Sequence, residues 1–126
     1  MSIVCSLAAS NVRCMIHYSI SVPSQAPVSF TVTADTSTSI TAGWQLPPAD
    51  SRNGIITGFK LFYKKKGSAD SLTILTINNG KTLTETVTGL DKNTAYQFQV
   101  LAFTSVGDGP KSSVQTERTR VGKTRI

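Results

Sequence analysis

The stretch TAYQFQVLA at residues 94–102 alternates strictly between two kinds of side chain. One side carries the larger apolar groups of Tyr96, Phe98 and Val100. The other side consists of Ala95, Gln97, Gln99 and Leu101. Because successive side chains of a β-strand point to opposite faces, the large apolar groups can enter a core while the two glutamines stay in water. The stretch therefore predicts a half-buried strand against which the rest of the chain must pack.

Six further segments of the chain are rich in β-forming residues and are bounded by turn signals. These are residues 28–33, 40–44, 56–64, 72–77, 82–87 and 112–116. In the third of them, Phe62 falls on the outward phase, and in the fifth Glu85 breaks the inward phase, which places it at a solvated start or edge. Seven strands at this spacing are typical of an all-β sandwich.

The chain divides into three parts by composition. Pro23 and Pro27 predict a stiff linker ahead of a domain that extends over residues 26–119, and residues 120–126 form a basic C-terminal linker. Residues 1–25 are then a disordered or loosely packed leader. The segment Ala8–Ala9–Ser10–Asn11–Val12 resembles Ala102–Phe103–Thr104–Ser105–Val106, 94 residues later. The leader is therefore either the final strand pair of a preceding repeat or similar to it by chance.

The charge is positive but unevenly distributed. The 126 residues carry a net charge of +6, with one lysine cluster near residue 65 and a basic tail after residue 117. Such a surface can attract nucleic acid, acidic glycans or anionic lipid. The alternative interpretation is that the lysines belong to a solvated turn and the tail to a linker. No run approaches the roughly 18–20 apolar residues that span a bilayer. The cysteines, Cys5 and Cys14, both lie in the leader, so the predicted domain must fold without a disulfide.

The sequence contains no pattern that predicts catalysis. The single histidine, His17, lies in the leader, and the seven acidic residues are scattered. No base stands near a serine or threonine at a spacing that would activate it, and the two cysteines with His17 do not form a zinc-binding pattern. We therefore expect no enzyme, no metal and no cofactor.

Several landmarks occur in a characteristic order. They are Pro27, the strand 39–44 with Trp44, Pro47–Pro48, the stretch 53–59, Thr88–Gly89–Leu90, Thr94–Ala95–Tyr96 and the segment from Ala102 to Gly109–Pro110. In this order the chain resembles a fibronectin type III domain over about residues 26–119. The resemblance implies an immunoglobulin-like sandwich of seven strands, with an A-B-E sheet against a C′-C-F-G sheet and no disulfide. It also implies that the Tyr96 hydroxyl bonds to the backbone near Leu90.

A set of apolar residues from these strands is expected to form the core. Its members are Trp44, Phe59, Leu61, Tyr63, Leu90, Tyr96, Phe98 and Val100. Full burial of each Leu, Val or Phe side chain contributes roughly 1.5–3 kcal/mol. We assign all eight to architecture and none to a site.

The best surface candidate is a group of four cations, Lys60, Lys64, Lys65 and Lys66. Strand alternation places Lys60 and Lys64 outward beside Phe62, which leaves the aromatic ring exposed. The hypothesis is that these lysines bind sulfated glycan or an acidic protein face.

The resemblance suggests two classes of function. The first is a monomeric protein-interaction or spacer module of a cell-surface or secreted adhesion or receptor protein, in contact with protein partners and neighbouring modules. The alternative is a scaffold module of an intracellular or cytoskeletal protein. Nucleic-acid binding ranks third. Some relatives carry an Arg-Gly-Asp tripeptide that binds integrins, but the corresponding residues here are Val106–Gly107–Asp108, so we expect no integrin binding by this route.

Overall fold

The computed structural model of the chain describes residues 2–8, 11–17, 21–69 and 71–121, with side chains from residue 21 onward. The strands are β1 (Ser2–Ala8), β2 (Asn11–His17), β3 (Val28–Ala34), β4 (Ile40–Gln45), β5 (Gly58–Lys65), β6 (Thr73–Ile77), β7 (Thr84–Val87), β8 (Ala95–Phe103) and β9 (Gln115–Arg118), with a short 3-10 helix at Ala49–Ser51. None of the described segments is a helix long and apolar enough to cross a membrane.

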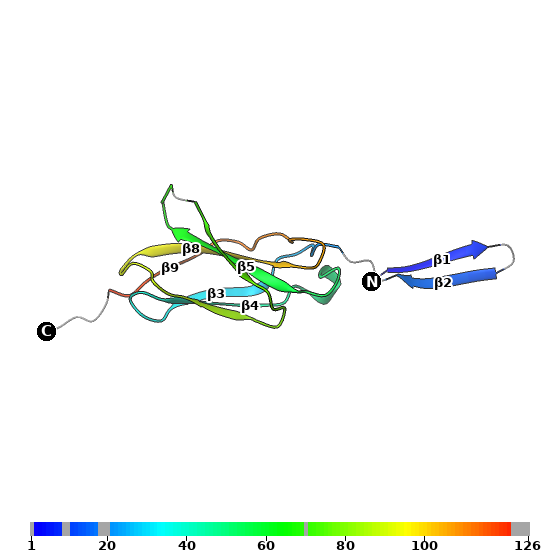
Figure 1. Cartoon of the computed structure of the whole chain (residues 1–126), viewed down its shortest axis with the longest axis horizontal. Coiled ribbons are helices and arrows are strands. Elements are labelled where there is room, and N and C mark those ends of the chain that lie inside the picture. Colours follow the sequence, from blue (N-terminus) through cyan, green and yellow to red (C-terminus); the bar gives the residue numbers. More distant parts are fainter. Residues whose placement is uncertain (1, 9–10, 18–20, 70, 122–126) are drawn as a thin grey trace.

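Seven of the strands form a two-sheet sandwich (Figure 1). One sheet has the order β3-β4-β7 and the other the order β6-β5-β8-β9, and every pairing is antiparallel. In this arrangement β8, which the sequence predicted at residues 94–102, lies between β5 and β9. The structure confirms the predicted all-β sandwich and its division into three and four strands. No cysteine lies in the sandwich, so no disulfide crosses it.

The strands β1 and β2 form a separate two-stranded sheet, in which Cys5 stands opposite Cys14. The sequence predicted a disordered or loosely packed leader here and left open whether its similarity to residues 102–106 marks a strand pair from a preceding repeat or arose by chance. Its origin as the end of a preceding repeat stays a prediction, and residues 1, 9–10 and 18–20 of the leader lie outside the described residues.

The core lies between the two sheets of the sandwich. Phe59, Leu61, Phe98 and Val100 are completely buried there, and Trp44 is only 2% exposed. The Trp44 ring packs on Phe59 with centroids 5.4 Å apart. Leu90 and Tyr96 are buried as well, whereas Tyr63 is partly buried and stacks on Phe98 with centroids 5.8 Å apart. The eight residues assigned to architecture thus all contact one cluster.

The last strand begins later than the sequence pattern predicts. We expected it at residues 112–116, but regular pairing extends over Gln115–Arg118. Ser112 accounts for the shift, because its backbone N–H donates to Val100 O at 2.8 Å and its hydroxyl accepts from Val100 N–H at 3.0 Å. The chain at Ser112 is therefore already held to β8, but by a side chain that interrupts the regular ladder.

The segment before β3 makes specific contacts with the sandwich. Ser21 and Ser24 donate backbone hydrogen bonds to Asn53 O and Ser51 O at 2.7 and 2.8 Å. Thr104 donates its hydroxyl to Ser21 O at 2.6 Å, and Pro23 is fully buried. Residues 21–24, which the sequence pattern placed in the linker, are therefore bound to two loops at one end of the sandwich.

Candidate functional site

The four candidate lysines lie along β5 and the turn that follows it, but they do not form one cluster. Lys60 and Lys64 are four residues apart, which corresponds to about 13 Å along a strand. Lys60 Nζ lies 2.8 Å from Asp108 Oδ2 and 5.9 Å from the centre of the Phe103 ring. Lys60 is therefore directed toward the loop after β8, away from the other three lysines.

The remaining three lysines lie toward the other end of β5. Lys65 forms an ion pair with Asp91, and Lys64 donates to Ser68 O at 3.5 Å. Lys66 is exposed. Two of the four cations thus have a carboxylate partner, which lowers the positive potential that the sequence alone suggests for this region.

The outer face of the four-stranded sheet has an apolar floor that the alternation pattern did not reveal. Phe62, expected to be exposed, is only 6% exposed, and the expectation was wrong. Lys111, from the segment after β8, lies with its Nζ 4.3 Å from the centre of the Phe62 ring and helps to cover it. Leu101, assigned to the wet side of β8, is also buried. Two apolar residues on the outward phase of adjacent strands were the signal for this floor.

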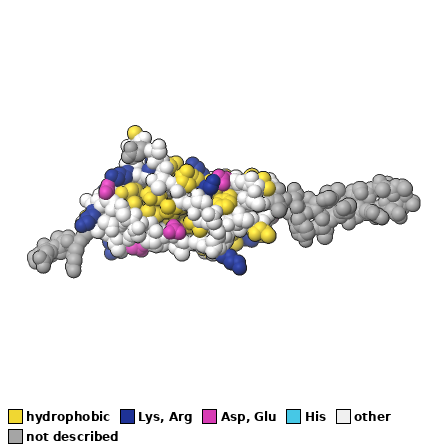
Figure 2. Space-filling view, in the orientation of Figure 1, with side chains coloured by type: hydrophobic (Ala, Val, Ile, Leu, Met, Phe, Trp, Pro, Cys, Tyr) yellow, Lys and Arg dark blue, Asp and Glu magenta, His cyan; other side chains and the backbone are white. Residues whose placement is uncertain are grey.

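A shallow groove of about 230 Å³ lies on this outer face. Its lining residues are Phe62, Lys64, Leu72, Gln97, Phe98, Gln99 and Val114. Leu72 and Val114 are exposed, and so is Ile74 of the neighbouring strand β6. Figure 2 shows such hydrophobic side chains on the surface of the sandwich, interspersed with Lys and Arg. The groove can therefore accept an apolar side chain next to a cation.

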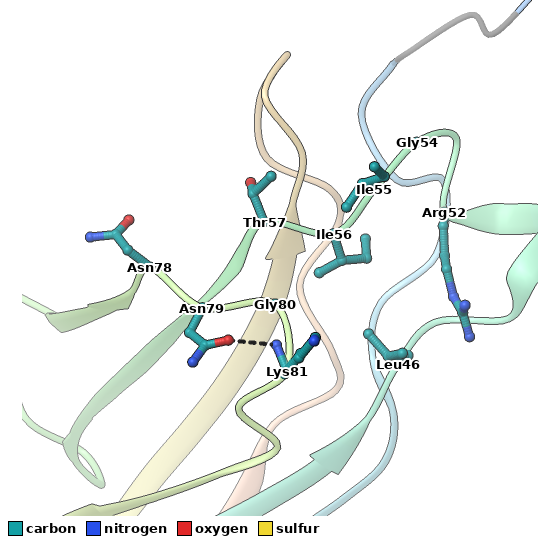
Figure 3. Close-up of a pocket in the computed structure, with 10 residues that line it drawn as sticks. All are labelled: Leu46, Arg52, Gly54, Ile55, Ile56, Thr57, Asn78, Asn79, Gly80 and Lys81. Atoms are coloured by element: carbon teal, nitrogen blue, oxygen red, sulfur yellow. Dashed lines mark hydrogen bonds between the residues drawn. The ribbon is translucent and has the colours of Figure 1, made fainter.

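A larger pocket of about 620 Å³ lies between the loop before β5 and the loop after β6 (Figure 3). Its wall includes Arg52 and Lys81, and Arg52 is positioned by an Nε–H donated to Pro47 O at 2.8 Å. The two loops touch closely, since a Cβ added at Gly80 would stand 1.8 Å from Ile56 O. The arrangement offers two cations and two asparagine amides beside aliphatic side chains.

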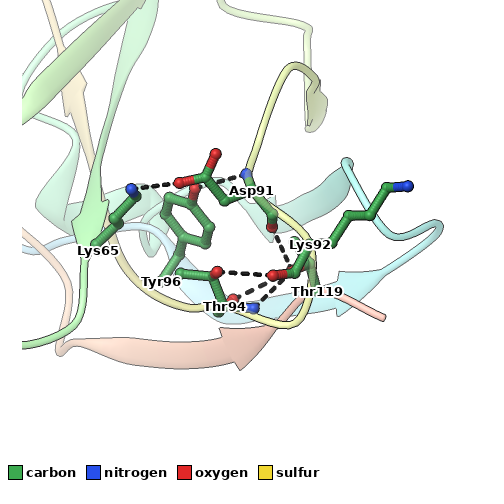
Figure 4. A network of polar contacts seen from close by, with 6 residues as sticks. All are labelled: Lys65, Asp91, Lys92, Thr94, Tyr96 and Thr119. Carbon is green, nitrogen blue, oxygen red and sulfur yellow. Dashed lines mark hydrogen bonds and ion pairs between the residues drawn. The ribbon is translucent and has the colours of Figure 1, made fainter. Parts of the chain in front are cut away.

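A polar network at the opposite end of the sandwich is structural (Figure 4). The Asp91 N–H donates to the Tyr96 hydroxyl at 2.9 Å, next to Leu90 where the family resemblance places this bond. The buried Thr119 donates its hydroxyl to Asp91 O at 2.6 Å and accepts from Thr94 N–H at 2.9 Å. Sequence reasoning missed Thr119, because an isolated threonine near the end of a chain carries no local signal.

The acidic residues of the described chain do not gather into a reactive centre. Within residues 21–69 and 71–121, no group of three or more His, Cys, Asp or Glu side chains is placed to hold a metal ion. Asp91 and Asp108 are occupied in ion pairs with lysines. The chemistry that these described surfaces offer is recognition by apolar contact and positive charge.

The comparisons with known proteins point in one direction. The family model described as "Fibronectin type III domain" matches residues 25–118. The chain is 40% identical over 101 residues to Protein sidekick-1 of Gallus gallus, covering 79% of this chain and 5% of that protein. It is 38% identical over 98 residues to the Netrin receptor DCC of Mus musculus, covering 78% of this chain and 7% of that protein.

Among solved structures, the FN5 domain of Drosophila Lar superposes with a TM-score of 0.64 at 31% identity. The match covers 80% of this chain and all of the Lar domain. The chain is thus similar to a whole single domain, and it spans less than one tenth of the two curated relatives.

Proposed function

The chain belongs to the fibronectin type III family, and we propose that it is a non-catalytic protein-interaction module of a cell-surface adhesion or receptor protein. The observation that carries the proposal is the similarity of residues from this one domain to a segment of a receptor, the Netrin receptor DCC. The matched segment is a small part of that protein, so the module is expected to act beside neighbouring modules and to face the extracellular side of the plasma membrane.

The surfaces of the module support this proposal. Most of the aromatic residues lie in the core, whereas Ile55, Ile74 and Val114 are exposed outside it. Isolated exposed apolar residues are ordinary, but here two of the three border a groove or pocket that also contains a cation. A protein partner can bury such residues and pair with the cations. The lining of the groove and the pocket offers no reactive side chain to a small-molecule substrate.

The alternative function is a spacer module of an intracellular or cytoskeletal protein. It is compatible with the absence of cysteine from the sandwich, because a domain that folds without a disulfide suits a reducing compartment as well as an oxidising one. An antibody raised against the full chain distinguishes the two. We expect it to stain intact cells that express the parent protein. Staining that requires permeabilisation would assign the module to the cell interior instead.

The interaction role itself is tested with the full chain displayed as a tetramer. We expect the tetramer to bind cells and the binding to disappear when the cells are first treated with protease to remove their surface proteins. Heparinase treatment serves as the control, because it removes sulfated glycan and leaves the proteins, so we expect binding to persist after it. Protease also removes the core proteins that carry sulfated glycan. Loss of binding after heparinase would therefore replace the protein partner by a glycan, with the four lysines as its site.

A further inference from the structure

Strand β6 is an edge strand with no protection against pairing. It contacts only β5 within its sheet, and the register Phe59↔Ile77 to Tyr63↔Thr73 is continuous, without a bulge. No charged residue and no proline occurs from Leu72 to Asn79. Ile74, the second residue of the strand, is 53% exposed. Natural proteins usually blunt such an edge, because its unpaired backbone groups attract another strand.

The other three edges of the described sandwich are blunted. Strand β3 has an irregular register between Val28 and Thr31, and its Ala34 N–H donates to Glu117 Oε2 at 3.2 Å. Strand β7 is four residues long and includes Glu85. Strand β9 contains a glutamate and an arginine within four residues. The open edge of β6 is therefore the exception within the sandwich.

The surroundings of β6 determine what could pair with it. On the outer face, Ile74 stands opposite the buried Phe62, and Thr76 stands opposite Lys60. Leu72 lines the groove together with Lys64. A strand added to β6 would lie about 10 Å from β5, two strand spacings away, so one carboxylate on it could approach Lys64 and a second could compete with Asp108 for Lys60. A hydrophobic residue beside Ile74, with acidic residues two positions before and after it, would match this face.

We propose that the β6 edge binds an extended segment of an acidic protein partner, by strand addition to the four-stranded sheet. The proposal rests on the interaction function proposed above and assigns its surface and the chemistry of its ligand. Backbone hydrogen bonds to β6 supply pairing, and the acid–x–aliphatic–x–acid pattern supplies selectivity. The occupant is not a second copy of this chain, because two chains of net charge +6 repel one another and β6 itself offers no carboxylate.

The test uses the nitrogen-15-labelled full chain and the peptide acetyl-Thr-Glu-Thr-Ile-Thr-Glu-Thr-amide. Titration followed by NMR should shift the amide signals of β6 and of its outer-face neighbours and slow the hydrogen exchange of the β6 amides that do not bond to β5. The same peptide with lysine in place of both glutamates should not bind. Two alternately N-methylated versions should differ, because only one edge of the peptide faces β6. Absence of shifts, shifts elsewhere, or equal binding of all these peptides would overturn the proposal.

Two variants test whether the peptide binds at the β6 edge or non-specifically to exposed apolar residues. Ile74→Glu places a negative charge on the exposed edge, opposes an acidic ligand and should abolish the shifts while the spectrum stays that of a folded domain. Val121→Glu adds the same charge at a more exposed aliphatic residue, outside both the groove and the larger pocket, and should bind the peptide as the wild type does. A concentration-dependent dimer in sedimentation that Ile74→Glu removes would instead make a second copy the occupant, and would also overturn the proposal.

The failures of the two proposals look different. If the tetramer binds cells through surface proteins and Ile74→Glu binds equally well, the interaction function stands and the β6 surface is wrong. If the peptide pairs with β6 but the tetramer binds no cell-surface protein, the edge is correct and the cell-surface function is wrong.

Discussion

The hydroxyl of Tyr96 fixes the turn that leads into β8. It accepts the Asp91 N–H at 2.9 Å, and the ring is buried. Replacing Tyr96 by Phe keeps the ring in the core and removes only this bond. We expect the free energy of unfolding to fall by about 1 kcal/mol, the usual net contribution of one hydrogen bond. Urea unfolding measures it.

Tyr63→Phe is the matched control for this variant. Tyr63 is partly buried against the same core, and no described residue hydrogen-bonds to its hydroxyl. Its unfolding midpoint should stay close to that of the wild type. If both variants unfold at the wild-type midpoint, the Tyr96 hydroxyl does not stabilise the turn.

Thr119 should be the more sensitive position. Its side chain is 2% exposed, and its hydroxyl serves both Asp91 O and Thr94 N–H. Thr119→Val keeps the shape but leaves two backbone groups without their partner, so we expect a loss of about 1–3 kcal/mol. Thr116→Val, at an exposed position of β9, is the control and should change stability little. Equal stability of the two variants in urea would contradict the assigned role.

At the scale of elements, the loop before β5 and the loop after β6 can pack together only because Gly80 has no side chain. A Cβ there would stand 1.8 Å from Ile56 O, a backbone atom that cannot rotate away. Gly80→Ala should therefore separate the loops that form the larger pocket and cost about 1–3 kcal/mol, as overpacking does.

Gly43→Ala provides the comparison, since the nearest atom to its added Cβ is 3.8 Å away in the middle of β4. It should unfold at or above the wild-type midpoint. NMR shifts confined to the two loops are expected for Gly80→Ala alone. A Gly80→Ala spectrum that superposes on the wild type would show that the loop contact is not required.

The elements also show where sequence patterning succeeds and where it stops. Alternation predicted the inward residues of β4, β5 and β8, because each depends only on the period of its own strand. It failed for Phe62 and Leu101, which lie on the outward phase and are buried nonetheless. The cover of Phe62 comes partly from Lys111, a residue outside any strand, and the position of such a segment follows from the completed fold rather than from local period.

At the scale of the whole molecule, the same distinction separates the fold from the candidate site. The seven-strand sandwich could be predicted, since turn signals and a period of two recur along the chain. The partners of the lysines could not. Asp91 and Asp108 lie in loops 26 and 48 residues after Lys65 and Lys60, and only the closed sheet brings each pair together. The open edge of β6 is equally a property of the assembled sheet, because no strand is an edge by itself.

The distribution of charge over the molecule determines what heparin should do. Reversing two cations in Lys64→Glu/Lys65→Glu removes the lysine beside the groove and turns the Asp91 ion pair into a repulsion. If the four lysines bind sulfated glycan, as the sequence hypothesis holds, this variant should elute from heparin resin at clearly lower salt than the wild type, since charge-driven binding is screened by salt.

Lys81→Glu/Lys92→Glu carries the same change in net charge at exposed positions outside the lysine group, and it controls for the net charge of +6. We expect it to elute close to the wild type. This result would show that heparin binding depends on the position of the lysines and not on net charge alone. Elution of both variants at the same salt would reduce the effect to total charge. Elution of Lys64→Glu/Lys65→Glu with the wild type would exclude the glycan site.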